Sequence, residues 1–473
     1  MNLSITRRGF LRGAAAAGAG LVVLKDAAAA RAMAANETVN LGLVGVAGRG
    51  SWFCDLLSRT PGLKLVALCD VNEFRAKAAY EQFPDLPKFA DFRVMLDKMR
   101  DKIDGVIVAT PDNTHAVVSA AAIRAGKGVF TEKPLTLNVY ESNVLRKLAR
   151  ENKVATQMGN QGTSSPAFHQ ALGLIRSGAL GEVREAYVWI GGGGGNKPRV
   201  NIGDVPCPPT LHWDLWLGPA KYRPYHTVWM QWHGWREFGS GNLGNWGSHS
   251  ANLPFMALKC HTLWHADAAA RPRIRFRGEA SEVDNERFPR WWTNRWEFPA
   301  REGLPPAVIH WVVQSAPAFA EVKQKMLDAG VTLNDQNQPS YEGASFHTGC
   351  FIPGTKGTIV ASSHNMSFKF LPKEKDQPSG HGTPAVPGPQ PTPPETPRLL
   401  GHERDWAAAI KGGKPAWSNY DYSSALNEML MLGNVSNQVP GEDLEYDPLA
   451  CKVVNSEKAD GLLRRQYREG WML

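Results

Sequence analysis

The sequence lacks the features that mark several protein classes. Its six cysteines form no C-x-x-C pair, so no metal site has support in the sequence. No apolar run approaches the roughly 20 residues that a membrane-spanning helix needs, which argues against stable membrane insertion. The formal net charge is +8, but half of it falls within residues 1–34, and the remainder shows no Lys/Arg cluster. A nucleic-acid partner is therefore not expected. The length of 473 residues predicts two or three domains.

Residues 1–34 are predicted to be an export signal rather than an ordinary N-terminal helix. A twin-arginine motif at Thr6–Arg12 precedes an apolar run at Ala14–Leu24 and a small-residue cleavage site at Ala32–Ala34. This route carries folded proteins, often with a cofactor already bound. We expect a periplasmic or exported protein whose partners include the twin-arginine export machinery. Disulfides are permitted there but not required, and most of the cysteines are expected to be buried free thiols.

A dinucleotide-binding unit follows. An apolar strand at Val39–Val44 leads through a glycine-rich turn to a helix at Ser51–Ser58 and a second strand at Leu63–Cys69, which ends at Asp70. In this pattern the turn approaches a pyrophosphate at a helix N-terminus, and the acidic residue binds the adenosine ribose. Asp70 favours NAD, with NADP as the alternative. The candidate turn residues are Gly45, Ala47, Gly48, Arg49 and Gly50, with Ala47 in place of the expected second glycine.

Further strands and helices alternate up to about residue 158. A buried strand at 105–110 precedes a helix at Ala116–Ala125 and another strand at 128–130. This order predicts an α/β fold with a parallel, doubly wound sheet, whose ligands lie at the carboxyl ends of its strands. The candidate ligand residues at these ends are Thr110, Asn113, His115 and Lys133.

Several segments together resemble the glucose–fructose oxidoreductase / inositol dehydrogenase / MocA superfamily, in its exported bacterial branch. They are Gly45–Gly50, Ala109–His115, Glu132–Pro134, Gln157–Gln161, Trp213–Ala220, Gly241–His249 and Tyr467–Trp471. The resemblance implies an NAD(P)-binding Rossmann domain at 35–158 and an α/β domain at 159–377. The second domain would have an open, largely antiparallel sheet that forms homo-oligomer contacts. A proline-rich linker at 378–397 and a helical segment at 398–473 that packs on the main body complete the expected organisation.

The resemblance also implies roles for individual residues. Lys133, Asn245 and His249 would carry the chemistry, and Pro111, Glu132, Asn160 and Gln161 would join the cofactor site. A histidine suits removal of a hydroxyl proton, and a lysine suits stabilisation of the resulting oxygen anion. The alternatives are a surface lysine and a core histidine. Asn245 replaces the carboxylate usual in the family, and Asn252 is a second such position, so we expect a less basic His249.

An aromatic region is the candidate sugar-binding surface. Six tryptophans lie between residues 213 and 246, interleaved with polar side chains. Aromatic faces beside hydrogen-bonding groups suit a sugar ring, although core packing is the alternative for each tryptophan. The candidates are Trp213, His233, Arg236 and Trp246. The run Gly191–Gly195 is either a flexible loop or a flap near the substrate.

Three functions remain open from the sequence. The first is an NAD(P)-dependent oxidoreductase acting on a secondary hydroxyl of a sugar or glycoside, with tightly bound cofactor. The second is a redox-neutral, NAD-dependent enzyme that cleaves glycosides by oxidation, elimination and re-reduction. The third is a non-catalytic sugar-binding relative, which the two asparagines at 245 and 252 make conceivable.

Overall fold

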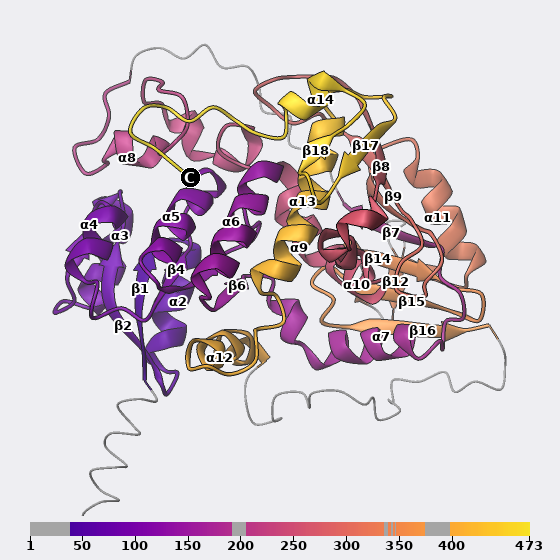
Figure 1. Cartoon of the computed structure of the whole chain (residues 1–473), viewed down its shortest axis with the longest axis horizontal. Helices are drawn as coiled ribbons and strands as arrows, with labels where there is room; N and C mark the ends of the chain where they lie inside the picture. Colours follow the sequence, from indigo (N-terminus) through magenta and orange to yellow (C-terminus); the bar gives the residue numbers. More distant parts are fainter. Residues whose placement is uncertain (1–37, 192–204, 335–338, 342–343, 346, 374–397) are drawn as a thin grey trace, which may run out of the picture.

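The computed structural model describes residues 38–191, 205–334, 339–341, 344–345, 347–373 and 398–473. Two β-sheets lie side by side, one in the N-terminal part and one in the remainder of the chain (Figure 1). The predicted export signal, the linker at 378–397 and all but the first residue of the glycine run lie outside the described residues.

The N-terminal sheet is parallel and has six strands in the order β3-β2-β1-β4-β5-β6. The strands are β1 (Val39–Val44), β2 (Leu63–Cys69), β3 (Lys88–Phe89), β4 (Gly105–Val108), β5 (Gly128–Thr131) and β6 (Thr156–Met158). This arrangement confirms the predicted doubly wound sheet. The order reverses direction beside β1, and ligands of such sheets bind at this point.

Side chains of each strand alternate between the two faces of this sheet, and each face packs on its own helices. Leu41 and Leu43 pack with α2 (Arg49–Ser58), α3 (Glu73–Gln82) and α12 (Arg398–Ile410). Val44 belongs to the opposite face, with α4 (Phe92–Lys98), α5 (Asp112–Arg124) and α6 (Val139–Asn152). Helix α5 starts earlier than the predicted Ala116, because Pro111 precedes it and Asp112 lies in its first turn, where both residues favour a helix start.

The second sheet has nine strands in the order β16-β15-β14-β7-β10-β9-β8-β17-β18. Only β7 and β10 pair in parallel, so the sheet is largely antiparallel, as predicted. Its strands are β7 (Glu185–Ile190), β8 (Ile274–Ala280), β9 (Trp292–Phe298), β10 (Ala307–Val313), β14 (Thr348–Pro353), β15 (Gly357–Ser362), β16 (Phe368–Pro372), β17 (Leu444–Asp447) and β18 (Lys452–Val453). A small sheet joins β11 (Thr332–Leu333), β12 (Pro339–Tyr341) and β13 (Ala344–Ser345).

Helices cover both faces of the second sheet (Figure 1). The interior face packs against α9 (Gly241–Ser250), α10 (Asn252–Ala257) and α13 (Tyr420–Ser436). Helix α11 (Phe319–Asp328) covers part of the other face through Phe319, Val322 and Met326. The remaining helices are α7 (Pro166–Arg176), α8 (Trp213–Leu217), α14 (Glu457–Gly461) and five short 3-10 turns, η1 (Gln161–Ser164), η2 (Thr227–Met230), η3 (Trp232–Gly234), η4 (Cys260–His265) and η5 (Ala268–Ala270).

The segment 398–473, expected to be helical, contains α12, α13 and α14 and also two strands. Leu444 and Tyr446 alternate in burial with their neighbours, as expected for a strand with one face on the core. Strand β17 pairs with β8 and β18 pairs with β17, so this segment adds two strands to the second sheet. The segment also completes the Rossmann domain, because Trp406 of α12 packs edge-on against Phe130 with ring centroids 5.7 Å apart. A Cβ on Gly105 would lie 2.9 Å from Trp406, so the glycine leaves room for the indole.

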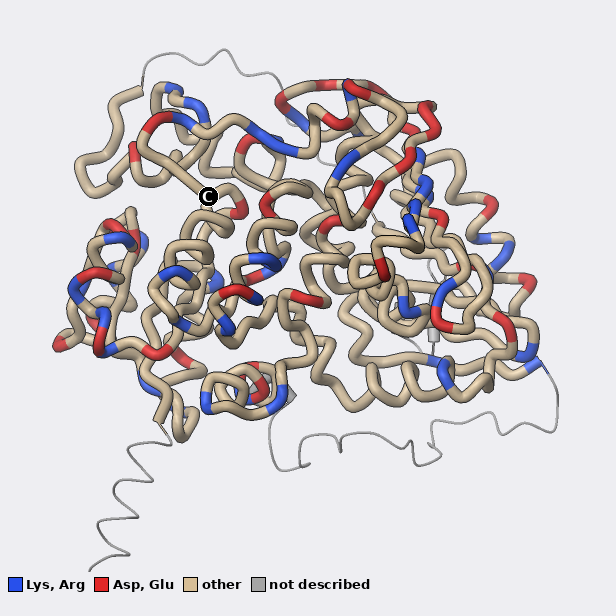
Figure 2. The backbone as a smooth tube through the Cα atoms, viewed as in Figure 1, with Lys and Arg blue, Asp and Glu red and all other residues tan. Residues whose placement is uncertain are grey.

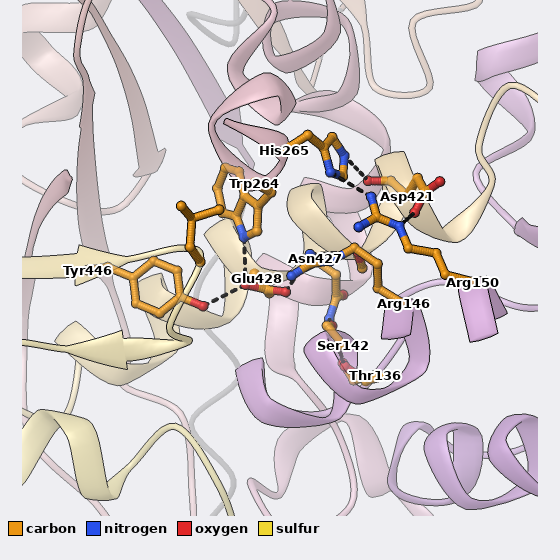
Figure 3. A network of polar contacts seen from close by, with 12 residues as sticks. Thr136, Ser142, Arg146, Arg150, Trp264, His265, Asp421, Asn427, Glu428 and Tyr446 are labelled. Atoms are coloured by element: carbon orange, nitrogen blue, oxygen red, sulfur yellow. Dashed lines mark hydrogen bonds and ion pairs between the residues drawn. The ribbon is translucent and has the colours of Figure 1, made fainter. Parts of the chain in front are cut away.

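A buried polar network holds α13 between the two domains (Figure 3). The Glu428 carboxylate accepts hydrogen bonds from Arg146 of α6 at 2.8 Å, and from Trp264 and Tyr446 at 2.6 Å each. Burial raises the pKa of Glu428, and the three donors offset part of this cost. These donors come from α6, η4 and β17, so one carboxylate joins elements of both domains.

The surface of the described chain carries charges of both signs. Figure 2 shows Lys and Arg interspersed with Asp and Glu along the helices and loops of both domains. The described helices include none with the length and apolar character to span a bilayer. All six cysteines lie in the described part of the chain as free thiols, of which Cys207 alone is exposed.

Candidate functional site

A cavity of about 490 Å³ lies between the two domains. One wall is the carboxyl edge of the parallel sheet, with the glycine turn, Asp70 and Lys133. The opposite wall comes from the second domain, through His249 of α9 and His364 of the β15–β16 turn. The segment 205–240, which we call the strap, covers the Rossmann side with an apolar cluster that includes Trp216 and Phe238.

The glycine turn has the backbone that a close approach requires. Gly45 and Gly48 have φ angles of 83° and 59°, which disfavour other residues. A Cβ on Gly45 would lie 2.6 Å from the Ala109 carbonyl oxygen, and one on Gly50 would lie 1.9 Å from the Gly45 oxygen. Ala47 is not among the described residues with positive φ, so its methyl group is tolerated.

The N-terminus of α2 opens on the cavity without a capping side chain. Its N-cap, Gly48, provides no side-chain cap, and its first turn holds no acidic residue. Helix N-termini with free amides attract phosphate groups. Gly50 does not line the cavity and serves the packing of this turn instead.

Asp70 stands at the end of β2, as predicted, and lines the cavity. Its carboxylate accepts the amides of Val46 and Asn72 at 2.9 Å each. Burial raises the pKa of Asp70, and these amides oppose the shift. The carboxylate thus fixes the glycine turn, and Arg75 of α3 lines the cavity close by.

Lys133 and Asn245 meet across the domain boundary. The Lys133 ammonium, which follows β5, donates a hydrogen bond to Oδ1 of Asn245 in α9. Burial lowers the pKa of Lys133, and the neutral amide adds no charge to oppose this shift. The prediction that these residues lie together therefore agrees with the geometry.

His249 lies one helical turn after Asn245, on the same helix, and is 4% exposed. Its Nδ1 atom has no hydrogen-bond partner among the described residues. Burial holds the pKa of His249 well below its ordinary value, and His364 and Lys133 add to this effect. The ring is therefore neutral at neutral pH, which is the form that accepts a proton.

His364 is a site residue that the sequence did not indicate. Its ring centroid is 4.2 Å from that of His249, and its Nδ1 atom is 3.0 Å from the Ser363 hydroxyl. Gly162 makes this approach feasible, because a Cβ there would lie 1.8 Å from the His364 carbonyl oxygen. A lone histidine between two short strands carries no motif, so only the tertiary fold reveals it.

A buried acid lies beside Lys133. Glu132 accepts hydrogen bonds from Arg49 at 2.7 Å and from Gln161 at 3.1 Å. All three residues line the cavity, as do Thr110 and Pro111. The guanidinium of Arg49 also lies over the Trp52 ring, 3.9 Å from its centroid. Arg49 and Glu132 therefore neutralise each other at this edge.

Three predicted cofactor residues are buried supports outside the cavity lining. The His115 ring joins the carbonyls of Pro134 and Thr110, at 2.8 and 2.9 Å. Asn113 donates to the Leu217 carbonyl at 2.9 Å, and Asn160 donates to the Ser248 carbonyl at 3.3 Å. These contacts fix neighbouring loops, and the Oδ1 atoms of Asn113 and Asn160 have no hydrogen-bond partner among the described residues.

Two predicted sugar-binding residues also lie away from the cavity. Trp213 stacks on Trp216 with centroids 4.8 Å apart and donates to the Arg223 carbonyl at 2.8 Å. Arg236 is partly buried, donates to the carbonyls of Asp284 and Arg287, and packs over Phe288. The Trp213 indole N–H and the Arg236 Nε–H thus donate to backbone carbonyls of neighbouring loops.

The strap contributes other side chains to the cavity. His233 lines it as predicted, together with Trp216, Met230 and Trp232. Trp246 borders a neighbouring hollow of about 530 Å³ that also contains Gly191. Its ring lies edge-on to His364, with centroids 5.7 Å apart, so the two hollows adjoin at His364.

Asn252, the second position noted in the sequence, serves the core. Its amide donates to Thr163 at 2.8 Å and accepts from the Tyr422 hydroxyl at 2.7 Å. The residue is 1% exposed and does not line the cavity. Of the two asparagines at positions where the family resemblance implies a carboxylate, Asn245 alone contacts a residue that lines the cavity. Only the asparagine at 245 therefore removes a negative charge from the site directly.

Comparison with known proteins finds one family that matches parts of both domains. Residues 39–160 match the model of the Gfo/Idh/MocA oxidoreductase family described as its NAD-binding Rossmann fold. Residues 186–259 match the C-terminal alpha/beta domain of the same oxidoreductase family. Both domains of the chain are therefore similar to the corresponding domains of the Gfo/Idh/MocA family. The glycine turn, the uncapped α2 N-terminus and Asp70 fit the dinucleotide that this family's Rossmann fold binds.

Curated members of the Gfo/Idh/MocA family match over part of their length. Inositol 2-dehydrogenase of Salmonella typhimurium is 31% identical over 148 residues, which cover 31% of this chain and 44% of the relative. Alpha-N-acetylgalactosaminidase of Shewanella oneidensis is 30% identical over 207 residues, which cover 38% of this chain and 44% of the relative. The chain thus spans less than half the length of these relatives.

Solved structures of Gfo/Idh/MocA proteins share the fold over most of the chain. An inositol dehydrogenase homolog from Azotobacter vinelandii, complexed with NADH and myo-inositol, has a TM-score of 0.56 at 16% identity and covers 87% of this chain and 97% of its own. Aldose-aldose oxidoreductase from Caulobacter crescentus has a TM-score of 0.54 at 15% identity, with 85% and 98% covered. At these identities the likeness concerns the fold alone.

Proposed function

We propose that this protein is an NAD(P)-dependent oxidoreductase that transfers hydride between nicotinamide and a secondary hydroxyl of a sugar or glycoside. The observation that carries the proposal is the convergence of Lys133 and His249, from different domains, on the cavity that begins at the glycine turn. Relatives that act on inositol and on a sugar derivative support this class of substrate.

The chain's own residues supply binding and proton transfer. When bound, the nicotinamide supplies the hydride acceptor or donor. His249, neutral through burial, accepts the proton of the substrate hydroxyl. The Lys133 ammonium stabilises the charge that develops on that oxygen. Asn245 holds Lys133 in place, and His233 and Trp232 of the strap border the space for the sugar.

Purified full-length protein tests this proposal. Mass spectrometry of nucleotide released on denaturation is expected to find NAD or NADP, and absorbance at 340 nm is expected to change when a substrate sugar is added. Lys133→Ala and His249→Ala should each lower kcat by roughly a hundredfold or more, because each removes a group needed in the transition state. A protein that binds sugar but neither retains nor binds nucleotide would instead be a non-catalytic relative.

We propose NAD as the preferred cofactor, with NADP as the alternative. Asp70 would repel a 2′-phosphate, whereas Arg75, which lines the same end, would attract one. Titration of nucleotide-free protein with each cofactor decides between them. Tighter binding of NADP would overturn the preference.

A second candidate is the redox-neutral cleavage of glycosides with the same residues. Its support is the match to alpha-N-acetylgalactosaminidase, which is as close as that to the dehydrogenases. A carbonyl formed beside a C–H group acidifies it, which permits elimination of a glycosidic oxygen. Release of p-nitrophenol from nitrophenyl glycosides without net NADH formation would favour this candidate over the first.

We also propose that the protein is exported by the twin-arginine machinery and assembles as a homo-oligomer. The support for export is the motif at Thr6–Arg12. Cell fractionation should find the wild-type protein in the periplasm and the Arg7→Lys, Arg8→Lys double variant in the cytoplasm. Light scattering of the purified protein tests the oligomer, and a monomeric mass would overturn it.

A further inference from the structure

The last described residues form an arm, 462–473, that joins the strap to the Rossmann domain (Figure 1). Arg465 donates to the Glu141 carboxylate of α6 at 3.1 Å. It also donates to the carbonyls of Asn113 in α5 at 2.6 Å and Glu237 of the strap at 3.3 Å. One guanidinium therefore joins α5 and α6 of the Rossmann domain to the strap.

A second arginine anchors the arm further along. Arg468 donates to the Gly218 carbonyl at 2.7 Å and forms an ion pair with Asp214 of α8. Its own amide binds the Pro219 carbonyl at 3.2 Å. These contacts fix the arm on the strap immediately before the chain turns toward the cavity.

Trp471 is the residue at which the arm meets the cavity. It is 9% exposed, lines the cavity and lies beside Phe92, with ring centroids 6.1 Å apart. The Arg93 guanidinium lies 4.7 Å from its ring centroid. Met472, the next residue, is 83% exposed, so burial here is specific to the indole.

Trp471 lies at the end of the cavity that suits an adenosine. Four residues after β2 border the cavity, as do Asp91 and Phe92 after β3; the four are Asp70, Val71, Asn72 and Arg75. In Rossmann domains the residues after the second strand receive the adenosine ribose. Lys133 and His249, where the chemistry is proposed, stand at other strand ends and in the second domain.

We propose that Trp471 forms part of the binding site for the adenosine half of the dinucleotide, and that the arm slows nucleotide exchange. This inference rests on the proposed function, because it requires a dinucleotide in the cavity. Stacking of a base on an aromatic ring is worth roughly 1–3 kcal/mol in proteins that bind single-stranded nucleic acids, which corresponds to about a 5- to 150-fold change in affinity. The arm's two arginine anchors hold that ring against the cavity.

The test uses full-length protein freed of nucleotide and calorimetric titration with NAD and with ADP-ribose. ADP-ribose lacks the nicotinamide, so its binding reports on the adenosine end independently of catalysis. Trp471→Ala is expected to raise the Kd of both ligands by roughly tenfold or more, and by a similar factor. Trp471→Phe should retain most of the affinity, and Met472→Ala, the adjacent exposed control, should leave both values unchanged.

Exchange is measured by chasing isotope-labelled NAD with an excess of unlabelled NAD. Arg468→Gln weakens the arm's anchor outside the cavity and is expected to speed release severalfold. This variant and Trp471→Phe decide the question if Trp471→Ala fails to fold. Unchanged affinity and release in the variants, with normal binding by the wild type, would overturn this inference alone. Failure of the wild type to bind either ligand would overturn the proposed function itself.

Discussion

The rings of His249 and His364 lie against each other with their centroids 4.2 Å apart, at the wall of the cavity opposite Lys133. They come from α9 and from the β15–β16 turn, so the fold brings together two groups that cannot both be charged without repulsion. The pKa of His364 is lowered by burial and by Lys133, and that of His249 lies well below its ordinary value. As the pH falls, His364 therefore protonates first and its charge opposes protonation of His249.

Replacing His364 with Gln should move the acid limb of the pH–activity profile to higher pH. The substitution removes a positive charge that holds the pKa of His249 down, so His249 would protonate, and stop acting as a base, at a higher pH. We expect a shift of about one pH unit in kcat/KM. The same substitution at His212, on the exposed strap, is the control. A profile that does not move would mean that His364 leaves His249 unaffected.

Replacing Asn245 with Asp should also move the profile to higher pH, by a different route. A carboxylate at this position would contact the Lys133 ammonium and lie one helical turn from His249. Both groups are then more stable when protonated, so both pKa values rise. The pH dependence of kcat/KM measures this shift, with Asn245→Leu as the isosteric control without charge. If the Asp variant keeps the wild-type optimum, the missing carboxylate does not set the basicity of His249.

The local pattern of the sequence was sufficient to predict the Rossmann sheet and several residues that line the cavity at its carboxyl edge. Strands β1 and β2 have the predicted bounds, and Gly45, Asp70 and Lys133 follow directly from their places at strand ends. A place at a strand end does not determine what a side chain contacts. His115 occupies such a place, yet its ring lies between the carbonyl oxygens of Pro134 and Thr110 and does not line the cavity.

Contacts between segments distant in the chain were not predictable in the same way. His364 depends on the packing of a hairpin against η1, which no motif marks. In the strap, the Trp213 indole N–H and the Arg236 Nε–H donate to backbone carbonyls of neighbouring loops. Composition indicated an aromatic surface there, but only the fold distinguishes tryptophans that face the cavity from those that support it.

Replacing Glu403 with Gln should stabilise the protein at high pH. This residue of α12 is 1% exposed, and neither carboxyl oxygen has a hydrogen-bond partner in the described chain. Burial raises the pKa of Glu403 to about 8 from 4.5. The folded protein is therefore at its most stable, with respect to this group, below pH 4.5, where the carboxyl is neutral in both the folded and the unfolded state. As the pH rises from 4.5 toward 8 the carboxyl ionises in the unfolded state but not in the folded state, so the free energy of unfolding falls.

Urea unfolding at several pH values measures this effect. At pH 5 the Glu403→Gln variant and the wild type should have similar free energies of unfolding. At pH 8 the variant should be more stable by up to about 5 kcal/mol, because it never carries the buried charge. Glu151→Gln, at an exposed position of α6, is the matched control and should show no such trend. A difference between the Glu403→Gln variant and the wild type that is constant with pH would contradict the prediction.

Replacing Arg146 with Ala should destabilise the fold far more than the same change at Arg150, one helical turn away. The Arg146–Glu428 pair is buried, with side chains 5% and 0% exposed, whereas the Arg150–Asp421 pair is about half exposed (Figure 3). Removing Arg146 leaves the Glu428 charge buried with only Trp264 and Tyr446 as donors, which costs about 3–5 kcal/mol. Removing Arg150 exposes Asp421 to water and should cost less than about 1 kcal/mol. The free energies of unfolding in urea measure both losses. The two arginines share a helix and differ chiefly in burial. Equal losses of stability in the two variants would therefore show that Arg146 does not stabilise the fold by neutralising the buried Glu428 carboxylate.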